Sequence, residues 1–252
     1  MDKRENVIKK IRECSPLVHN ITNYVVMNNT ANALLAIGAS PIMSHAIEEI
    51  EDILNISSSL VINMGTLSEK WIESMVFAAK KANELNKPFV LDPVGVGASM
   101  YRNETANKII ESSTPNVIRG NASEIMALAQ IAIATKGVDS TAKSKDAISA
   151  AQKLSKKLNN TIVISGEMDF VITQDTITEI KGGSSLMPAV TGMGCTSTSI
   201  IGACIGVESD FHLASCAGME LMGRIGKKAE KLSHGPSSFQ MNFIDSLYNL
   251  YK

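Results

Sequence analysis

Apolar and polar positions alternate with two different periods along most of the 252-residue chain. Stretches in which apolar residues recur every three or four positions predict helices, whereas short unbroken apolar runs predict buried strands. In the first part of the chain this pattern predicts helices over residues 4–13, 24–37, 47–54 and 68–86, and strands over 17–21, 41–43, 60–64 and 89–93. Further on it predicts strands over 116–119 and 161–164, a hairpin of strands 170–173 and 177–180, a short helix with Glu124 in its first turn, and helices over 144–158, 195–205, 211–229 and 236–248.

The order of these elements defines a fold class. Strands that are separated by helices need crossover connections, which favour a mainly parallel central sheet with helices on both faces, a three-layer α/β/α arrangement. Because nothing resembling a linker interrupts the chain, we expect residues 1–252 to form a single domain. Ligands of such sheets bind beyond the carboxyl ends of the strands, which here are residues 63–65, 92–95, 119–121 and 165–167.

Composition narrows the classes of partner. Hydrophobic residues make up 44% of the chain and the formal net charge is -1, which gives no electrostatic reason to expect nucleic acid or an anionic membrane and favours a small-molecule partner. The charged N-terminus does not resemble a signal peptide, and no apolar window approaches the length of a membrane span. The four cysteines form no C-x-x-C pair, which argues against zinc or a disulfide framework. We therefore expect a cytoplasmic protein with reduced thiols.

A glycine loop over residues 190–199 is the strongest candidate for chemistry. Gly192 and Gly194 precede small hydroxyl residues and an apolar run, as expected where a loop enters a helix. The free N–H groups and dipole of a helix N-terminus can hold a phosphate, although the same glycine pattern also occurs in simple tight turns. The chain lacks a Walker-type loop and the third glycine of a dinucleotide-binding motif.

Cys195 follows these glycines at the predicted start of the helix. A thiol in that place has a lowered pKa, so Cys195 could take a proton from a substrate hydroxyl that attacks phosphorus. Alternatively, cysteine is simply small enough to fit beside the glycines.

Two carboxylates and an arginine lie near the predicted strand ends. Asp92 and Glu124 are hard oxygen ligands of the kind that suit Mg²⁺, and Arg119 suits bidentate recognition of phosphate, so together they indicate a nucleoside triphosphate site. Taken singly, Asp92 could cap a turn before Pro93, and Glu124 could serve only the N-terminus of a helix.

The segment of residues 19–29 is rich in amides. Asn23 would make a good N-cap, and amides can also bind the heteroatoms of a small aromatic substrate, with Met43 as a soft apolar wall.

With these residues assembled, the chain resembles the hydroxyethylthiazole kinases, members of the ribokinase-like superfamily. Five strings match the family in order along almost the whole chain: residues 20–28 (NITNYVVMN), 38–43 (GASPIM), 92–98 (DPVGVGA), 118–124 (IRGNASE) and 191–195 (TGMGC). Two positions depart from the usual family pattern, because Met193 and Ser165 stand where threonine is frequent. Neither change removes a backbone donor, so we expect activity to survive.

The resemblance implies ATP-dependent phosphorylation of the hydroxyl of 4-methyl-5-(2-hydroxyethyl)thiazole in thiamine salvage, with Mg²⁺ bridging the phosphates. It implies a homotrimer with sites between subunits, where the N-terminal amides of one chain meet the glycine loop of another. The implied roles are thiazole contact for Met43 and Gly192, ATP contact for Arg119 and Ser165, and the metal region for Asp92 and Glu124. We add Asn23 at the substrate, and Cys195 with Gly194 at the transferring phosphate. The alternatives are a related kinase for another heterocyclic alcohol, such as hydroxymethylpyrimidine, and a non-catalytic thiazole or nucleotide sensor.

Overall fold

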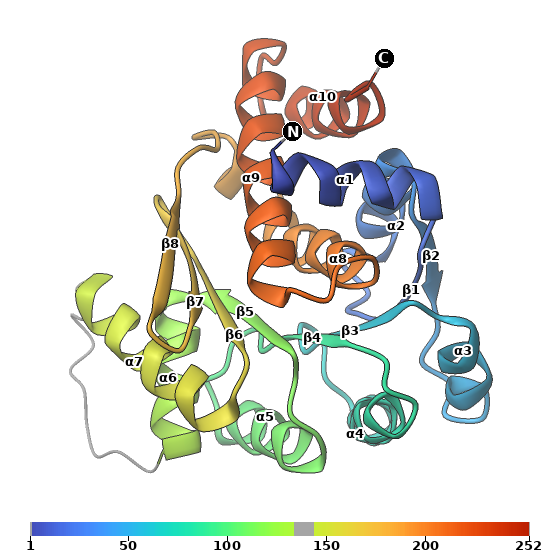
Figure 1. Cartoon of the computed structure of the whole chain (residues 1–252), viewed down its shortest axis with the longest axis vertical. Helices are drawn as coiled ribbons and strands as arrows, with labels where there is room; N and C mark the ends of the chain where they lie inside the picture. The colour runs from blue at the N-terminus through green and yellow to red at the C-terminus, as the bar shows by residue number, and fades with distance from the viewer. Residues whose placement is uncertain (1, 134–143, 252) are drawn as a thin grey trace.

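The structure, a computed structural model, describes residues 2–133 and 144–251 and forms three layers, α/β/α (Figure 1). The middle layer is one eight-stranded sheet made of β1 (Leu17–Ile21), β2 (Ser40–Met43), β3 (Ser59–Asn63), β4 (Phe89–Asp92), β5 (Val117–Asn121), β6 (Thr161–Ser165), β7 (Asp169–Thr173) and β8 (Thr176–Ile180). Its order is β2-β1-β3-β4-β5-β6-β7-β8. The strands from β2 to β6 pair in parallel, whereas β7 and β8 add an antiparallel hairpin at one edge. The predicted fold class is confirmed.

Helices cover both faces of this sheet (Figure 1). One face carries α1 (Lys3–Cys14), α2 (Met27–Ile37), α8 (Met193–Ile205), α9 (Phe211–Lys231) and α10 (Pro236–Tyr248). The other carries α3 (Ile50–Ile56), α4 (Glu69–Glu84), α5 (Met100–Ser112), α6 (Ala122–Ile133) and α7 (Ser144–Leu158). None of the helices in the described part of the chain is long and apolar enough to cross a membrane.

The two faces of the sheet differ in side-chain size. On the face of α8 the central strands present valines, among them Val61, Val90 and Val117, whereas the opposite face presents larger side chains such as Ile62, Phe89 and Leu91. Successive residues of a strand point to opposite faces, so this division follows from the sequence. The valine face leaves room for α8 to approach the strands closely.

Gly202 shows how close that approach is. A Cβ atom at this position would lie 2.4 Å from Cγ2 of Val61, and the hydroxyl of Ser59 donates a hydrogen bond to the Gly202 carbonyl at 2.7 Å. The helix is therefore fixed against β3 by contact and by a buried hydrogen bond. Its N-terminal turn, which carries the glycine loop, is held in place with it.

The structure also adds to and corrects the predicted elements. Helix α5 and a short 3-10 turn, η1 (Met187–Ala189), were not predicted, and α6 has 12 residues rather than being short. Most residues of α5 are polar and only Thr105, Ala106 and Ile109 are buried, so its apolar stripe is too weak to stand out. Helix α2 begins at Met27 rather than at residue 24, because residues 24–26 form a turn.

Candidate active site

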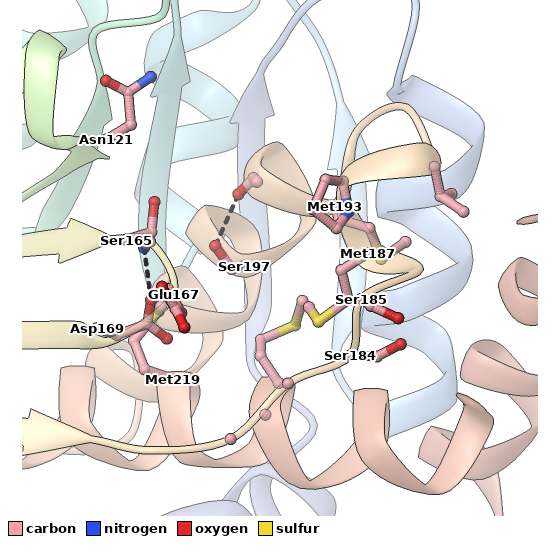
Figure 2. Close-up of a pocket in the computed structure, with 18 of the residues that line it drawn as sticks. Asn121, Ser165, Glu167, Asp169, Ser184, Ser185, Met187, Met193, Ser197 and Met219 are labelled. Carbon is pink, nitrogen blue, oxygen red and sulfur yellow. Dashed lines mark hydrogen bonds between the residues drawn. The ribbon is translucent and has the colours of Figure 1, made fainter. Parts of the chain in front are cut away.

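A large pocket of about 1110 Å³ opens at the carboxyl ends of the parallel strands. Figure 2 shows Ser165, Glu167 and Asp169 on one side of it and Ser184, Ser185 and Met187 on the other, with Met193 and Ser197 of α8 between them. The pocket also includes Arg119, Gly192 and Gly194. Four predicted site residues, Arg119, Ser165, Gly192 and Gly194, thus lie at one cavity.

The first turn of α8 faces this pocket. Gly192 is the N-cap and has a φ of 90°, and a Cβ atom there would lie 2.7 Å from Cγ1 of Val26, so both the backbone and the space require glycine. A Cβ at Gly194 would lie 2.7 Å from Nη1 of Arg119, which places the guanidinium directly on the helix N-terminus. Nη2 of Arg119 donates to the Ser165 hydroxyl at 2.5 Å. Backbone N–H groups and a fixed cation together are suited to hold an anion.

A buried polar network lies against an adjacent face of the same turn. Oδ2 of Asp92 accepts hydrogen bonds from the Asn63 amide at 2.8 Å and from the Thr198 hydroxyl at 2.7 Å, and Nη1 of Arg119 lies 3.9 Å away. Oδ1 of Asp92 is buried and has no hydrogen-bond partner among the described residues. Burial raises the pKa of Asp92 to about 6, and Arg119 and the hydrogen bonds oppose this rise only in part.

Glu124 is occupied by backbone groups. Its two carboxylate oxygens accept from the N–H groups of Gly95 and Asn121, each at 2.8 Å, while Oδ1 of Asn121 accepts from the Glu124 N–H at 2.9 Å. Asn121 and Glu124 thus cap the N-terminus of α6 reciprocally, which is the purely structural role that the sequence also allows for Glu124. Its negative charge also contributes to the raised pKa of Asp92, so the two carboxylates influence the same region.

The donor set fits Mg²⁺ only as a site that is shared with phosphates. No group of three or more His, Cys, Asp or Glu within residues 2–133 and 144–251 is arranged to hold a metal ion. Mg²⁺ often binds through one or two carboxylates together with water and substrate phosphates. Asp92, with its unpartnered Oδ1, matches that smaller requirement, whereas both carboxylate oxygens of Glu124 already accept backbone N–H groups.

Cys195 differs from its sequence-based expectation. It is the third residue of α8, and its Sγ accepts a hydrogen bond from the Asn23 amide at 3.6 Å. The expected lowering of its pKa is wrong: burial, followed by the nearby charge of Asp92, raises the pKa of the thiol. The pKa is lowered by hydrogen bonds from Asn63 and Asn23 and by the charge of Arg119, but these effects are smaller than the rise caused by burial and Asp92. The group at this position is therefore mainly a thiol at neutral pH.

Asn23 belongs to the buried network and is not a helix cap. Its Nδ2 donates to Oδ1 of Asn63 at 2.7 Å and its Oδ1 accepts from the Val25 N–H at 3.2 Å, whereas α2 begins only at Met27. The N-cap interpretation is wrong. Asn23 also meets α8 of its own chain, so this contact does not require a second subunit.

An aromatic cluster continues from this point. The ring of Tyr24 lies 4.6 Å from that of Trp71, and the ring of His45 lies 4.4 Å from Trp71 on another side. Met43 ends the edge strand β2, where it pairs in register with Asn20, and is not among the residues that line the large pocket.

Three residues of the site were missed by sequence reasoning. Asn63 stands at a predicted strand end, a position that could have marked it, and Thr198 lies in the glycine-loop string. Arg102 gave no signal, because it lies on the unpredicted α5. Its guanidinium donates to the carbonyls of Met64 and Val94, each at 2.6 Å, and of Gly65 at 2.9 Å, which ties the ends of β3 and β4 together.

The parallel sheet, the glycine-initiated helix and the pocket at the strand ends define a protein with the ribokinase-like fold. Two solved structures share this fold at low identity: a ribokinase-like superfamily protein from Enterococcus faecalis (TM-score 0.67, 13% identity, 99% of this chain and 94% of that one) and Bacillus subtilis pyridoxal kinase as an ADP complex (TM-score 0.65, 16% identity, 86% and 92%).

Sequence similarity identifies the family. The model of the hydroxyethylthiazole kinase family matches residues 8–252. The hydroxyethylthiazole kinase of Brachyspira hyodysenteriae is 53% identical over 245 residues, which cover 97% of this chain and 92% of that protein. The solved structure of the hydroxyethylthiazole kinase of Pyrococcus horikoshii has a TM-score of 0.92 at 37% identity and covers 100% of this chain and 95% of that one. The chain belongs to the hydroxyethylthiazole kinase family.

Proposed function

We propose that this protein transfers the γ-phosphate of ATP to the hydroxyl of 4-methyl-5-(2-hydroxyethyl)thiazole. The observation that carries the proposal is the position of the first turn of α8. The large pocket with Arg119 and Ser165 lies against this turn, and the network of Cys195, Asn23 and Asp92, none of which lines that pocket, lies against an adjacent face of it. A phosphate at the helix N-terminus can thus meet a nucleotide in the pocket and an alcohol at the network, the two partners that direct in-line transfer requires.

The residues then take separable roles. The N–H groups at the start of α8, including that of Gly194, and the guanidinium of Arg119 stabilise charge on the transferring phosphoryl group, and Ser165 orients Arg119. The bond between the γ-phosphorus and its bridging oxygen breaks while the substrate oxygen bonds to phosphorus. Gly192 and Asn23 contact the thiazole side.

Cys195 positions the attacking hydroxyl in this proposal. Its raised pKa leaves little thiolate at neutral pH, but a loose transition state does not require the hydroxyl proton to leave early. The small thiolate fraction can accept that proton as the new bond forms.

We propose Mg²⁺ as the metal, held by Asp92 and Glu124 together with the ATP phosphates. When bound, it neutralises phosphate charge. The unpartnered Oδ1 of Asp92 supports this assignment.

We also propose a cytoplasmic location, because the proposed reaction consumes ATP, which the cytoplasm supplies.

We further propose a homotrimer with sites between subunits, in which Met43 of one chain contributes to a neighbour's thiazole site. Tyr24 and Val25, which follow Asn23, are each 62% exposed and offer apolar surface beside the substrate end. Light scattering tests this directly: a particle of three times the 27.0 kDa chain mass is expected, and a monomer at all concentrations contradicts it.

One assay tests the activity. ADP release is followed with ATP, Mg²⁺ and either the thiazole alcohol, hydroxymethylpyrimidine or no alcohol, and the product is identified by its mass. We expect ADP release that depends on the thiazole alcohol. Turnover only with the pyrimidine would replace the substrate, and binding of both ligands without transfer would establish a non-catalytic sensor instead.

A further inference from the structure

Asn63 occupies the centre of the buried network. It is the last residue of β3, pairs in register with Asp92 at the end of β4, and is only 1% exposed. Its side chain contacts groups from three other parts of the chain: Asp92, Asn23 and the backbone of Gly65. A buried amide with this many partners either stabilises the fold alone or fixes the geometry of the groups it contacts.

The orientation of the Asn63 amide is determined by its partners. Oδ1 accepts from the Gly65 backbone N–H at 2.9 Å, a group that can only donate, so Nδ2 must point the other way. Nδ2 then donates to Oδ2 of Asp92 at 2.8 Å. The backbone of the β3–α4 loop thus sets the direction of the whole amide.

The orientation of the Asn63 amide fixes how two neighbouring side chains, Asn23 and Asp92, are turned. Because Oδ1 of Asn63 also accepts from Nδ2 of Asn23, it turns the donor end of Asn23 toward Sγ of Cys195. On the other side, two donors on Oδ2 of Asp92 leave Oδ1 as the buried oxygen without a partner among the described residues. A single amide therefore decides which carboxylate oxygen is free and which face of Asn23 meets the thiol.

We infer that Asn63 is a positioning residue for phosphoryl transfer, which holds Asp92 and, through Asn23, Cys195 in the geometry that the reaction needs. The inference rests on the proposed function. It requires that loss of the Asn63 donor lower turnover more than it weakens the binding of ATP, because Asn63 does not line the nucleotide pocket and reaches Arg119 only through Asp92.

The Asn63→Asp variant replaces that donor by an acceptor and places a second carboxylate beside Asp92. Aspartate has nearly the same shape and can still accept from Asn23 and from the Gly65 N–H, but it cannot donate to Asp92 as a carboxylate. Asn160→Asp is the matched control: Asn160 is also buried, and its Nδ2 donates to the Pro115 carbonyl at 3.0 Å at the opposite end of the sheet. Asn63→Ser, which is smaller and uncharged, removes the amide donor without adding a charge, so a loss of kcat in both variants assigns the effect to the donor rather than to the charge.

Steady-state kinetics and thermal unfolding of the purified full-length variants test the inference. We expect kcat to fall roughly 10–100-fold in both Asn63 variants, which is the size of loss that a displacement of about 1 Å can cause. KM for ATP should change by a smaller factor than kcat. Asn160→Asp should lower the unfolding temperature and leave kcat per folded protein unchanged. An Asn63 variant that loses stability but keeps the wild-type kcat, or one that changes only KM for ATP, would overturn the inference. An inactive wild type would instead refute the proposed function, so the two failures are distinguishable.

Discussion

Substitution of Gly202 by alanine tests whether the close approach of α8 to the sheet holds the active-site geometry. The added methyl would lie 2.4 Å from Cγ2 of Val61, whereas carbon atoms in contact prefer a separation of about 3.5–4.0 Å. Val61 is completely buried, and Ser59 holds the Gly202 carbonyl, so neither side can yield easily. We expect α8 to move outward by about 1 Å.

The expected cost follows from two opposing effects. Overpacking of a core costs about 1–3 kcal/mol, and a contact this short belongs near the upper end, whereas alanine favours a helix over glycine by about 1 kcal/mol. The variant should therefore lose about 2 kcal/mol of unfolding free energy. Because Thr198 and Gly194 move with the helix, away from Asp92 and Arg119, kcat should fall by up to about 100-fold.

A second substitution, at Val61, tests whether this contact itself causes the effect. Val61→Ala removes the methyl that blocks the new side chain. The double variant should therefore lose less unfolding free energy than the two single variants lose in total, by a coupling of about 1–2 kcal/mol, and should recover part of the kcat. Urea unfolding at fixed protein concentration and steady-state kinetics measure both quantities. Strictly additive costs, or a Gly202→Ala variant with wild-type stability and kcat, would show that this contact does not set the position of α8.

Three further predictions concern residues of the site itself. Cys195→Ser should lower kcat yet leave measurable activity, since positioning and charge stabilisation dominate phosphoryl transfer, and an activity equal to the wild type at every pH would exclude proton transfer to Cys195. Arg119→Ala should raise KM for ATP and, because the guanidinium also stabilises the transferring phosphoryl group, lower kcat; an unchanged KM would contradict its place at the phosphates. Asp92→Asn should abolish turnover but stabilise the fold at pH 8. The pKa of Asp92 is raised to about 6 in the folded protein, so the wild type keeps its full unfolding free energy below pH 4 and loses about 3 kcal/mol of it as the pH rises through 6. Asparagine carries no charge and avoids this loss. Urea unfolding at pH 4 and pH 8 checks this, and a variant that is less stable than the wild type by the same amount at both pH values would refute it.

The sequence was sufficient for the fold because its strongest signals are periodic. The valine and isoleucine alternation of β3–β7 and the apolar stripes of most helices appear directly as buried faces. Helix α5 escaped because its few buried positions are spread among polar residues, although Ser99 caps it. Periodicity detects how much of an element is buried, so a mostly solvated helix gives little signal.

The site could be predicted only in part. Strand ends and glycines located Asp92, Arg119 and the start of α8, because their positions depend on topology. The raised pKa of Cys195 could not be foreseen, since it depends on the depth of burial and on the distance to a charge from another strand. The network through Asn63 likewise depends on how amides from β3 and the β1–α2 turn are oriented in space.

The aromatic cluster of Tyr24, His45 and Trp71 gives this chain an intrinsic fluorescence probe beside the proposed substrate site. Trp71 is the single tryptophan of the sequence, so all tryptophan emission originates beside Tyr24 and His45. The indole is 3% exposed, whereas Tyr24, which directly follows Asn23, is 62% exposed. A ligand that orders Tyr24, or a neighbouring subunit that covers it, changes the surroundings of the indole without any label. Fluorescence can therefore follow events at the alcohol side while ADP release reports the nucleotide side, and the order of the two can be timed in a single sample.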